Sequence, residues 1–169
     1  MTEPAANYTS IDLRERFHAQ AYRVWGGTLI VVLVWVGLIL APALLQGSSS
    51  SIYTFFSYIC HQLPDRTLHL AGGPMAVCTR CFGVYAGLFL GILVYPLWRP
   101  VVEIEPIPRI WLFLAIIPIT IDWSLTVFGF WENTHLSRVV TGLILGFACA
   151  TYIVPALVEI VRNIVRSRA

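Results

Sequence analysis

The fold is decided by residues 24–45, VWGGTLIVVLVWVGLILAPALL, which carry no charged side chain. A helix needs about 20 predominantly apolar residues to cross the hydrocarbon core of a bilayer. Three further stretches meet that requirement: residues 81–98, 110–130 and 139–161. Their apolar residues are continuous rather than alternating with polar ones, which excludes a transmembrane β-barrel. The sequence therefore predicts an all-α, polytopic membrane protein with four transmembrane helices.

The composition supports a single membrane domain over residues 1–169. Hydrophobic residues make up 57% of the chain and charged residues 12%, whereas a soluble domain carries about 25% charged residues. The mean hydropathy of +0.75 points the same way. A formal net charge of +2 provides no basic field for nucleic acid, so the expected partner is the lipid bilayer.

The distribution of arginine predicts the orientation, because the cytoplasmic segments of membrane proteins carry an excess of basic residues. One side of a four-helix topology carries eight arginines: Arg14, Arg16, Arg23, Arg99, Arg109, Arg162, Arg166 and Arg168. The other side carries three: Arg66, Arg80 and Arg138. This asymmetry predicts that both termini are cytoplasmic and that the loop over residues 46–80 faces outward.

Two segments outside the spans are expected to lie near the membrane surface. Residues 52–59, IYTFFSYI, are too short to span and rich in aromatic side chains, which predicts a short interfacial helix in the first outer loop. Residues 11–22 mix apolar and charged side chains. They predict either an interfacial helix along the inner surface or a short solvated arm.

Two of the predicted spans carry small residues at every fourth position. The positions are Gly83, Gly87 and Gly91 in the span 81–98, and Gly142, Gly146 and Ala150 in the span 139–161. Such a stripe lets another helix backbone approach closely. The expected contact is either between these two helices or with another chain, in a homo-oligomer or a larger membrane complex.

The predicted outer loop leads into the second span with three of the four cysteines, in the pattern Cys60-His61 followed by Cys78-x-x-Cys81. A Cys-x-x-Cys turn completed by another cysteine and a histidine supplies a zinc site of the Cys3His type. Cys60, His61, Cys78 and Cys81 are therefore the candidate metal ligands, with His69 as the substitute for His61. Because adjacent side chains on a helix point about 100° apart, Cys60 and His61 meet one ion only where the backbone is irregular.

Other interpretations use the same features. A helix N-terminus lowers the pKa of a nearby thiol, and Arg80 lies between Cys78 and Cys81, which fits a quinone-linked thiol-disulfide oxidoreductase with a quinone near Arg80. An outward loop in an oxidising compartment also suits one structural disulfide. A third class of function is a non-catalytic accessory subunit that docks onto a larger membrane complex through the glycine stripes.

The span 110–130 contains a single charged residue, Asp122. A carboxylate inside the bilayer is costly, and it marks either a functional site or a structural ion pair. Arg80 and Arg138, at the outer ends of their helices, are the expected partners of Asp122. Together with Asn133 they predict a polar pocket beneath the cysteines, and these four residues are the candidate catalytic groups if the protein is an enzyme.

This pattern resembles the signature of small prokaryotic membrane proteins that share a domain of unknown function, number 2085. The first half of the signature is Cys-His-Gln-x-Pro-x-Arg, a Gly-Pro turn and Cys-x-Arg-Cys-x-Gly-x-Tyr-x-Gly, carried here by Cys60, His61, Gln62, Pro64, Arg66, Gly73, Pro74, Cys78, Arg80, Cys81, Gly83, Tyr85 and Gly87. The second half is Asp122, then Asn133 and Arg138, before Thr141 and Gly142. The resemblance implies the topology, the membership of the site and a location in the plasma (inner) membrane of a prokaryote.

A second similarity, of architecture, is to the quinone-linked thiol oxidases of the bacterial inner membrane. These are also four-helix proteins with cytoplasmic termini and an outward Cys-x-x-Cys at the start of the second helix, which matches Cys78 and Cys81 here. They carry a second cysteine pair in the outer loop between the third and fourth helices. This chain has no cysteine in that loop, which favours a metal site over a thiol relay.

Overall fold

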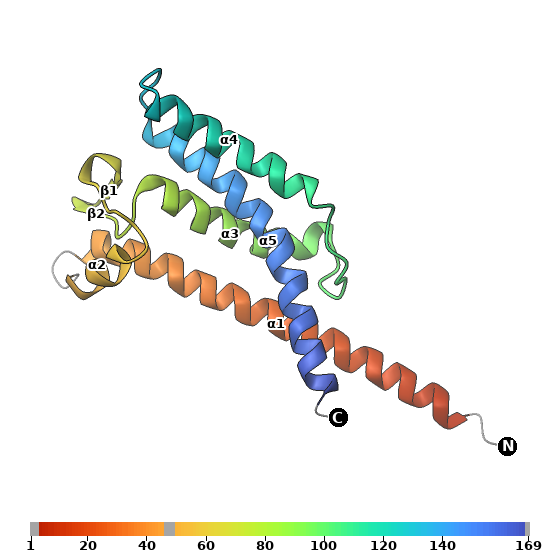
Figure 1. Ribbon diagram of the computed structural model, residues 1–169. Helices are drawn as coiled ribbons and strands as arrows, with labels where there is room; N and C mark the ends of the chain where they lie inside the picture. The colour runs from red at the N-terminus through yellow and green to blue at the C-terminus, as the bar shows by residue number, and fades with distance from the viewer. Residues whose placement is uncertain (1–3, 46–49, 168–169) are drawn as a thin grey trace.

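The computed structural model describes residues 4–45 and 50–167, and it consists of long helices with a small hairpin at one end (Figure 1). The elements in chain order are α1 (Pro4–Leu45), α2 (Ser50–Ser57), the 3-10 turn η1 (Pro64–Arg66), β1 (His69–Leu70), β2 (Gly73–Pro74), α3 (Thr79–Trp98), α4 (Ile110–Val127) and α5 (His135–Arg166). Four of them, α1, α3, α4 and α5, are long and apolar enough to cross a membrane. The predicted all-α fold with four transmembrane helices is confirmed. Residues 46–49 of the predicted outer loop, and Arg168, lie outside the described residues.

The helix limits differ from the hydropathy limits at the start of α1, the start of α3, the end of α4 and both ends of α5. The helix α1 begins at Pro4, so residues 11–22 are part of one continuous helix and do not form a separate interfacial helix. The helix α4 ends at Val127, because Gly129 takes a left-handed φ of +72° that stops a helix. The helix α5 continues to Arg166, since its polar last turns keep the helical backbone beyond the apolar run.

The loop between α1 and α3 is folded rather than extended. Its aromatic segment forms the helix α2, as expected, and Phe56 packs edge to face on Trp35 of α1 with ring centroids 5.4 Å apart. The location of α2 at a membrane interface stays a prediction. The strands β1 and β2 pair antiparallel across Ala71 and Gly72, whose φ values of 50° and 88° suit a tight two-residue turn.

The helices α3 and α5 form the centre of the bundle and run parallel. Both begin at the same end, where the hydroxyl of Thr79 lies 3.4 Å from the imidazole Nδ1 of His135. The glycine stripes face each other: a Cβ on Gly87 would lie 2.3 Å from the carbonyl oxygen of Leu143. The stripes therefore make the contact within the chain. Association with another chain stays a prediction and would use a different surface.

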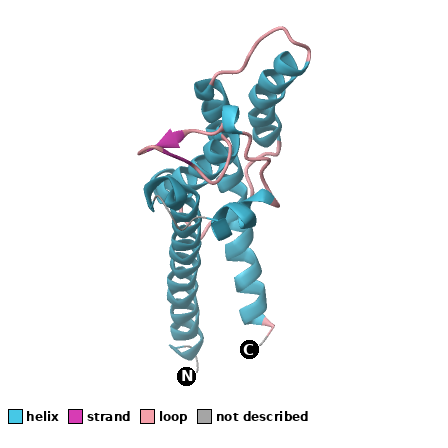
Figure 2. Cartoon of the chain, turned by 90° about the vertical axis from the view of Figure 1, so that its left-hand side faces the viewer, coloured by secondary structure: helices cyan, strands magenta, loops and turns pink. Residues whose placement is uncertain are grey.

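The remaining helices pack on this pair to different extents. The indole nitrogen of Trp25 in α1 donates to the carbonyl oxygen of Ile92 in α3 at 2.8 Å, and Arg162 of α5 lies over the ring of Phe17. The helix α4 is the most exposed, since only Ala115 of its side chains is buried. Figure 2 shows both chain ends on the same side of the molecule, below the hairpin. Exposed apolar faces of this kind suit contact with lipid tails.

Candidate functional site

The site begins with three cysteine thiols that come from two segments. Cys60 follows α2, whereas Cys78 and Cys81 lie at the start of α3. Their sulfur atoms all lie within 4.8 Å of one another. Cys60 is buried, Cys78 and Cys81 are half-buried, and all three thiols are free. Three thiols gathered at one point form a donor set for a soft metal ion such as zinc.

An irregular turn brings Cys60 to α3. Gln62 takes a left-handed φ of 49°, which an L side chain adopts only where contacts hold it. Its side-chain amide donates to the carbonyl oxygens of Tyr53 at 2.9 Å and Ala76 at 2.8 Å. These two bonds join α2 to the segment that enters α3. The irregular backbone expected after Cys60 is therefore present, and Gln62 maintains it.

Replacing Gln62 by alanine is expected to lower the free energy of unfolding by about 2–4 kcal/mol, because two hydrogen bonds disappear and the left-handed φ loses its support. Thermal unfolding of the protein in detergent, followed by tryptophan fluorescence, measures the change. Gln20→Ala is the matched control, since the amide of Gln20 makes one long contact of 3.5 Å to Val161. Equal unfolding temperatures for the two variants would contradict the role assigned to Gln62.

The start of α3 favours the thiolate form of Cys78. Cys78 is the N-cap of the helix, and its backbone N–H donates to the sulfur of Cys60 at 3.1 Å. Hydrogen bonds from the thiols of Cys60 and Cys81 lower the pKa of the Cys78 thiol below its ordinary value. The positive end of the helix dipole acts in the same direction. Thiolates are the form in which cysteine binds metals.

The structure brings together three of the four predicted ligands. The side chain of His61 is exposed and is not part of the cysteine group. The substitute ligand, His69, is exposed on β1. The prediction that a histidine completes the site therefore has no support from a contact. Cys149 is half-buried in α5, away from the group, as an apolar core residue would be.

A polar cluster lies beside the cysteines and joins α3 and α4 to the loop before α5. Asp122 of α4 accepts hydrogen bonds from the guanidinium of Arg80 in α3 and, at 2.6 Å, from the side-chain amide of Asn133. The Asp122 and Arg80 side chains are 11% and 22% exposed, so the ion pair is largely shielded from solvent. Of the two expected partners of Asp122, the structure selects Arg80. Arg138 lies close by in the first turns of α5.

Two of the cysteines and two members of the polar cluster, Arg80 and Asn133, line one cavity of about 240 Å³. Its polar lining is Arg66, Arg80, Arg138, Asn133, Thr126, Cys78 and Cys81. Thr79 is a further residue of the site, because its hydroxyl donates to the carbonyl oxygen of Arg66 at 2.7 Å and fixes that residue at the cavity. In the sequence, only its position between Cys78 and Cys81 indicates this role. Glu132 is exposed in the loop before α5, and His135 is the exposed first residue of α5.

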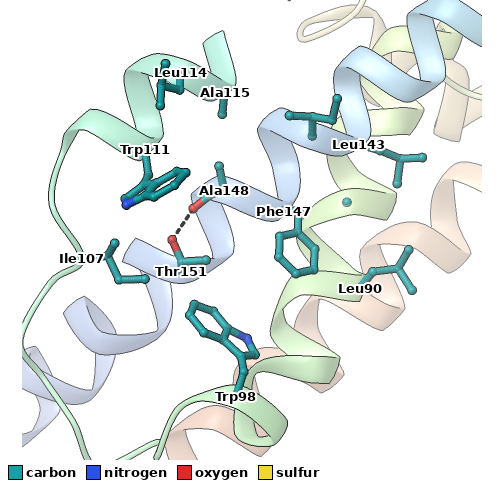
Figure 3. Close-up of a pocket in the computed structure, with 12 residues that line it drawn as sticks. Leu90, Trp98, Ile107, Trp111, Leu114, Ala115, Leu143, Phe147, Ala148 and Thr151 are labelled. Carbon is teal, nitrogen blue, oxygen red and sulfur yellow. Dashed lines mark hydrogen bonds between the residues drawn. The ribbon is translucent and has the colours of Figure 1, made fainter. Parts of the chain in front are cut away.

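A larger cavity of about 680 Å³ lies between α3, α4 and α5, toward the end of α3 at Trp98 (Figure 3). Trp98, Trp111, Phe147 and Leu114 are among the side chains that line it. None of its lining residues is titratable, and the hydroxyl of Thr151 already donates to the carbonyl oxygen of Ala148 at 2.7 Å. This cavity suits acyl chains and offers no group for chemistry.

Comparison with known proteins places this arrangement in a family. Residues 60–152 match the family described as predicted membrane protein (DUF2085). An uncharacterized protein of Methanocaldococcus jannaschii is 38% identical over 114 residues, which cover 67% of this chain and 72% of that protein. An uncharacterized protein of Methanothermobacter thermautotrophicus is 36% identical over 95 residues, which cover 56% of this chain and 84% of that protein. No solved structure matches the chain. The matched segment runs from Cys60 to the middle of α5 and contains the cysteine group and the polar cluster, so the chain is a multi-pass membrane protein that belongs to the DUF2085 family.

Proposed function

We propose that the protein binds a zinc ion through the thiolates of Cys60, Cys78 and Cys81. The observation that supports this is the distance of at most 4.8 Å between any two of the three sulfur atoms. Zinc takes four ligands in a tetrahedron, with a Zn–S distance of about 2.3 Å, so sulfur atoms around one ion lie about 3.8 Å apart, which is within this limit. Because His61 is exposed, we assign the three thiolates alone to the protein ligands. Water or a ligand from the neighbouring cavity takes the fourth position.

The proposed metal has a structural role. It joins the loop that carries Cys60 to the start of α3, which otherwise meet through the N–H of Cys78 and the amide of Gln62. The buried side chains around Cys60, among them Ile39, Phe56 and Val77, shield the site from solvent on the side of Cys60. Backbone N–H donors and a packed surrounding are the usual support of a metal ligand.

The proposed location is the plasma (inner) membrane, with both termini in the cytoplasm and the cysteine end of the bundle outside. The excess of arginine at the end that carries the termini supports this orientation. Fusing a periplasmic reporter enzyme after residue 169 tests it: the fusion is expected to be inactive, and an active fusion would reverse the orientation.

The metal is tested by elemental mass spectrometry together with thiol titration, on protein purified in detergent without a chelator. About one zinc per chain is expected, with the three thiols unreactive until the protein is denatured. Cys81→Ser is expected to lose the metal and to unfold at a lower temperature, because the structural metal contributes directly to folding. Cys149→Ser is the matched control and is expected to keep both. A metal content unchanged in Cys81→Ser would rule out the site.

The second candidate function is thiol-disulfide exchange at Cys78 and Cys81. The lowered pKa of the Cys78 thiol and its contact with Cys81 favour it. Oxidation of the two thiols to a disulfide releases two electrons and two protons, which a quinone takes up as quinol. A metal-free protein with two of the thiols oxidised, and thiol oxidation that depends on added quinone, would support this function in place of the first.

A further inference from the structure

We propose that the cavity of about 240 Å³ beside the cysteines binds an oxyanion of the phosphate class. We call this cavity the arginine pocket, and its polar lining is Arg66, Arg80, Arg138, Asn133, Thr126, Cys78 and Cys81. The proposal rests on the arginines and not on the zinc. It assigns a ligand class to a site for which neither the family nor the relatives named above give one.

The charge around the pocket is unbalanced. Three guanidinium groups line it, and the carboxylate of Asp122 pairs with Arg80 alone. Within residues 4–45 and 50–167, neither Arg66 nor Arg138 forms an ion pair. Zinc held by three thiolates adds only a single negative charge, so the pocket stays cationic with the metal bound. Like charges that line one pocket repel, and a bound anion reduces this repulsion.

Each arginine is presented by a different element, and two are held in place. The backbone of Arg66, at the end of η1, accepts the hydrogen bond of the Thr79 hydroxyl at 2.7 Å. The guanidinium of Arg80 is held by Asp122. Arg138 lies in the first turns of α5, where its backbone N–H donates to the carbonyl oxygen of Thr134 at 3.2 Å. Planar guanidinium groups that converge from several sides match the tetrahedral oxygens of a phosphate, which each group binds through two N–H donors.

Two further features favour an anion here. The helices α3 and α5 are parallel, so their N-termini lie at the same end, beside the pocket. The positive ends of both helix dipoles attract negative charge. In addition, the Nε of Arg80 and the Oδ1 of Asn133 are buried without a hydrogen-bond partner. A hydrogen phosphate or a phosphate monoester is both donor and acceptor, so it can satisfy an orphaned donor and an orphaned acceptor together.

The pocket volume suits this ligand. A water molecule occupies about 30 Å³ of the liquid, so about 240 Å³ holds a five-atom oxyanion together with several waters. The pocket lies where α3 and α5 begin and α4 ends, and Asp122 is five residues before Val127, the last residue of α4. Phosphate can reach this level either from solution or as the headgroup of a phospholipid, and the two sources share the chemistry that the arginines recognise.

The test uses the full chain, purified in an uncharged detergent and a phosphate-free buffer. Binding of radiolabelled orthophosphate is measured by equilibrium dialysis, and binding of dihexanoyl phosphatidic acid by its competition with that label. Dihexanoyl glycerol, which lacks the phosphate, is the lipid control. The variants are Arg66→Gln and Arg138→Gln, with Arg109→Gln as the matched control, because Arg109 is exposed at the far end of α4. Unfolding temperature and zinc content are recorded for every preparation.

Orthophosphate is expected to bind the wild-type protein, and each pocket variant is expected to bind at least about tenfold more weakly, since one charge-assisted contact is lost. Arg109→Gln is expected to bind as the wild type does. Competition by phosphatidic acid, but not by dihexanoyl glycerol, identifies the headgroup as the ligand, and no competition identifies free phosphate. Absence of binding by a folded wild-type protein, or binding by both pocket variants as tight as that of the wild type, overturns the proposal. Phosphate binding without zinc would refute the metal site and leave this inference standing.

Discussion

Gly146→Ala is expected to lower the free energy of unfolding by at least about 3 kcal/mol, toward the upper end of the cost of overpacking. The Cβ of an alanine at this position would lie 2.0 Å from the carbonyl oxygen of Val84 and 2.8 Å from the backbone nitrogen of Leu88. Both atoms belong to the backbone of α3, which cannot rotate away as a side chain can. The helices α3 and α5 must therefore separate, and the unfolding temperature in detergent is expected to fall by about 10 °C.

Gly37→Ala is the matched control for this result. Gly37 also lies within a long apolar helix, α1, but a Cβ there meets nothing within 4 Å. Alanine favours the helical backbone over glycine by about 1 kcal/mol, so the unfolding temperature is expected to stay the same or to rise slightly. If Gly146→Ala behaved like Gly37→Ala, the close approach of α3 and α5 at this position would be wrong.

The same stripe shows what periodicity can and cannot predict. Glycines at every fourth position place a flat face on one side of a helix, which the sequence states directly. Which helix packs against this face depends on how the helix is rotated about its axis relative to its neighbours. The sequence of one helix carries no information on this rotation. The structure places Gly83 and Gly87 against Val139 and Leu143, so the facing stripe belongs to the same chain.

Hydropathy predicted the existence of the four long helices better than their limits. It measures which part of a helix suits lipid, and a helix continues wherever its backbone hydrogen bonds continue. The first turns of α1, from Pro4, and the last turns of α5, up to Arg166, are polar and helical at once. Of these three helix limits, only the end of α4 has a local stop signal in the sequence. That signal is Gly129, which takes the left-handed conformation that ends a helix.

The sequence predicts which site residues lie close together where their spacing along one helix determines it. It does not predict this where the direction of a side chain depends on how a turn or a helix is oriented. The pair Cys78 and Cys81 lies one turn apart on α3, so their proximity follows from helix geometry. Cys60 and His61 are adjacent in the chain, and the turn held by Gln62 directs the thiol, but not the imidazole, to the group. The sequence likewise placed Arg80 and Arg138 at the level of Asp122 without deciding between them.

Asp122→Ala is expected to cost about 3–5 kcal/mol, because removing one partner of a buried ion pair leaves the other charge uncompensated. The carboxylate accepts from both Arg80 and Asn133. The loss is expected to act mainly on α4, which buries only Ala115 and has few other attachments to the bundle. The unfolding temperature in detergent measures the cost, and limited proteolysis after α4 reports whether that helix is released.

Thr120→Ala is the matched control on the same helix. The hydroxyl of Thr120 is exposed and donates to the carbonyl oxygen of Ile116 within its own helix, so its loss is expected to change stability by less than about 0.5 kcal/mol. An Asp122→Ala protein that unfolds at the temperature of the Thr120→Ala protein would show that the pair does not hold α4.

The double variant Arg80→Met/Asp122→Leu distinguishes a structural pair from a functional one. Replacing both members of a buried ion pair by apolar side chains is often neutral or stabilising, so the double variant is expected to recover most of the stability that Asp122→Ala loses. Binding of orthophosphate is expected to stay weak in it, because the guanidinium of Arg80 is gone from the pocket. Recovery of stability without recovery of binding assigns Arg80 two separable roles, one toward Asp122 and one toward the anion. Recovery of both would restrict Arg80 to the first role and leave the anion to Arg66 and Arg138.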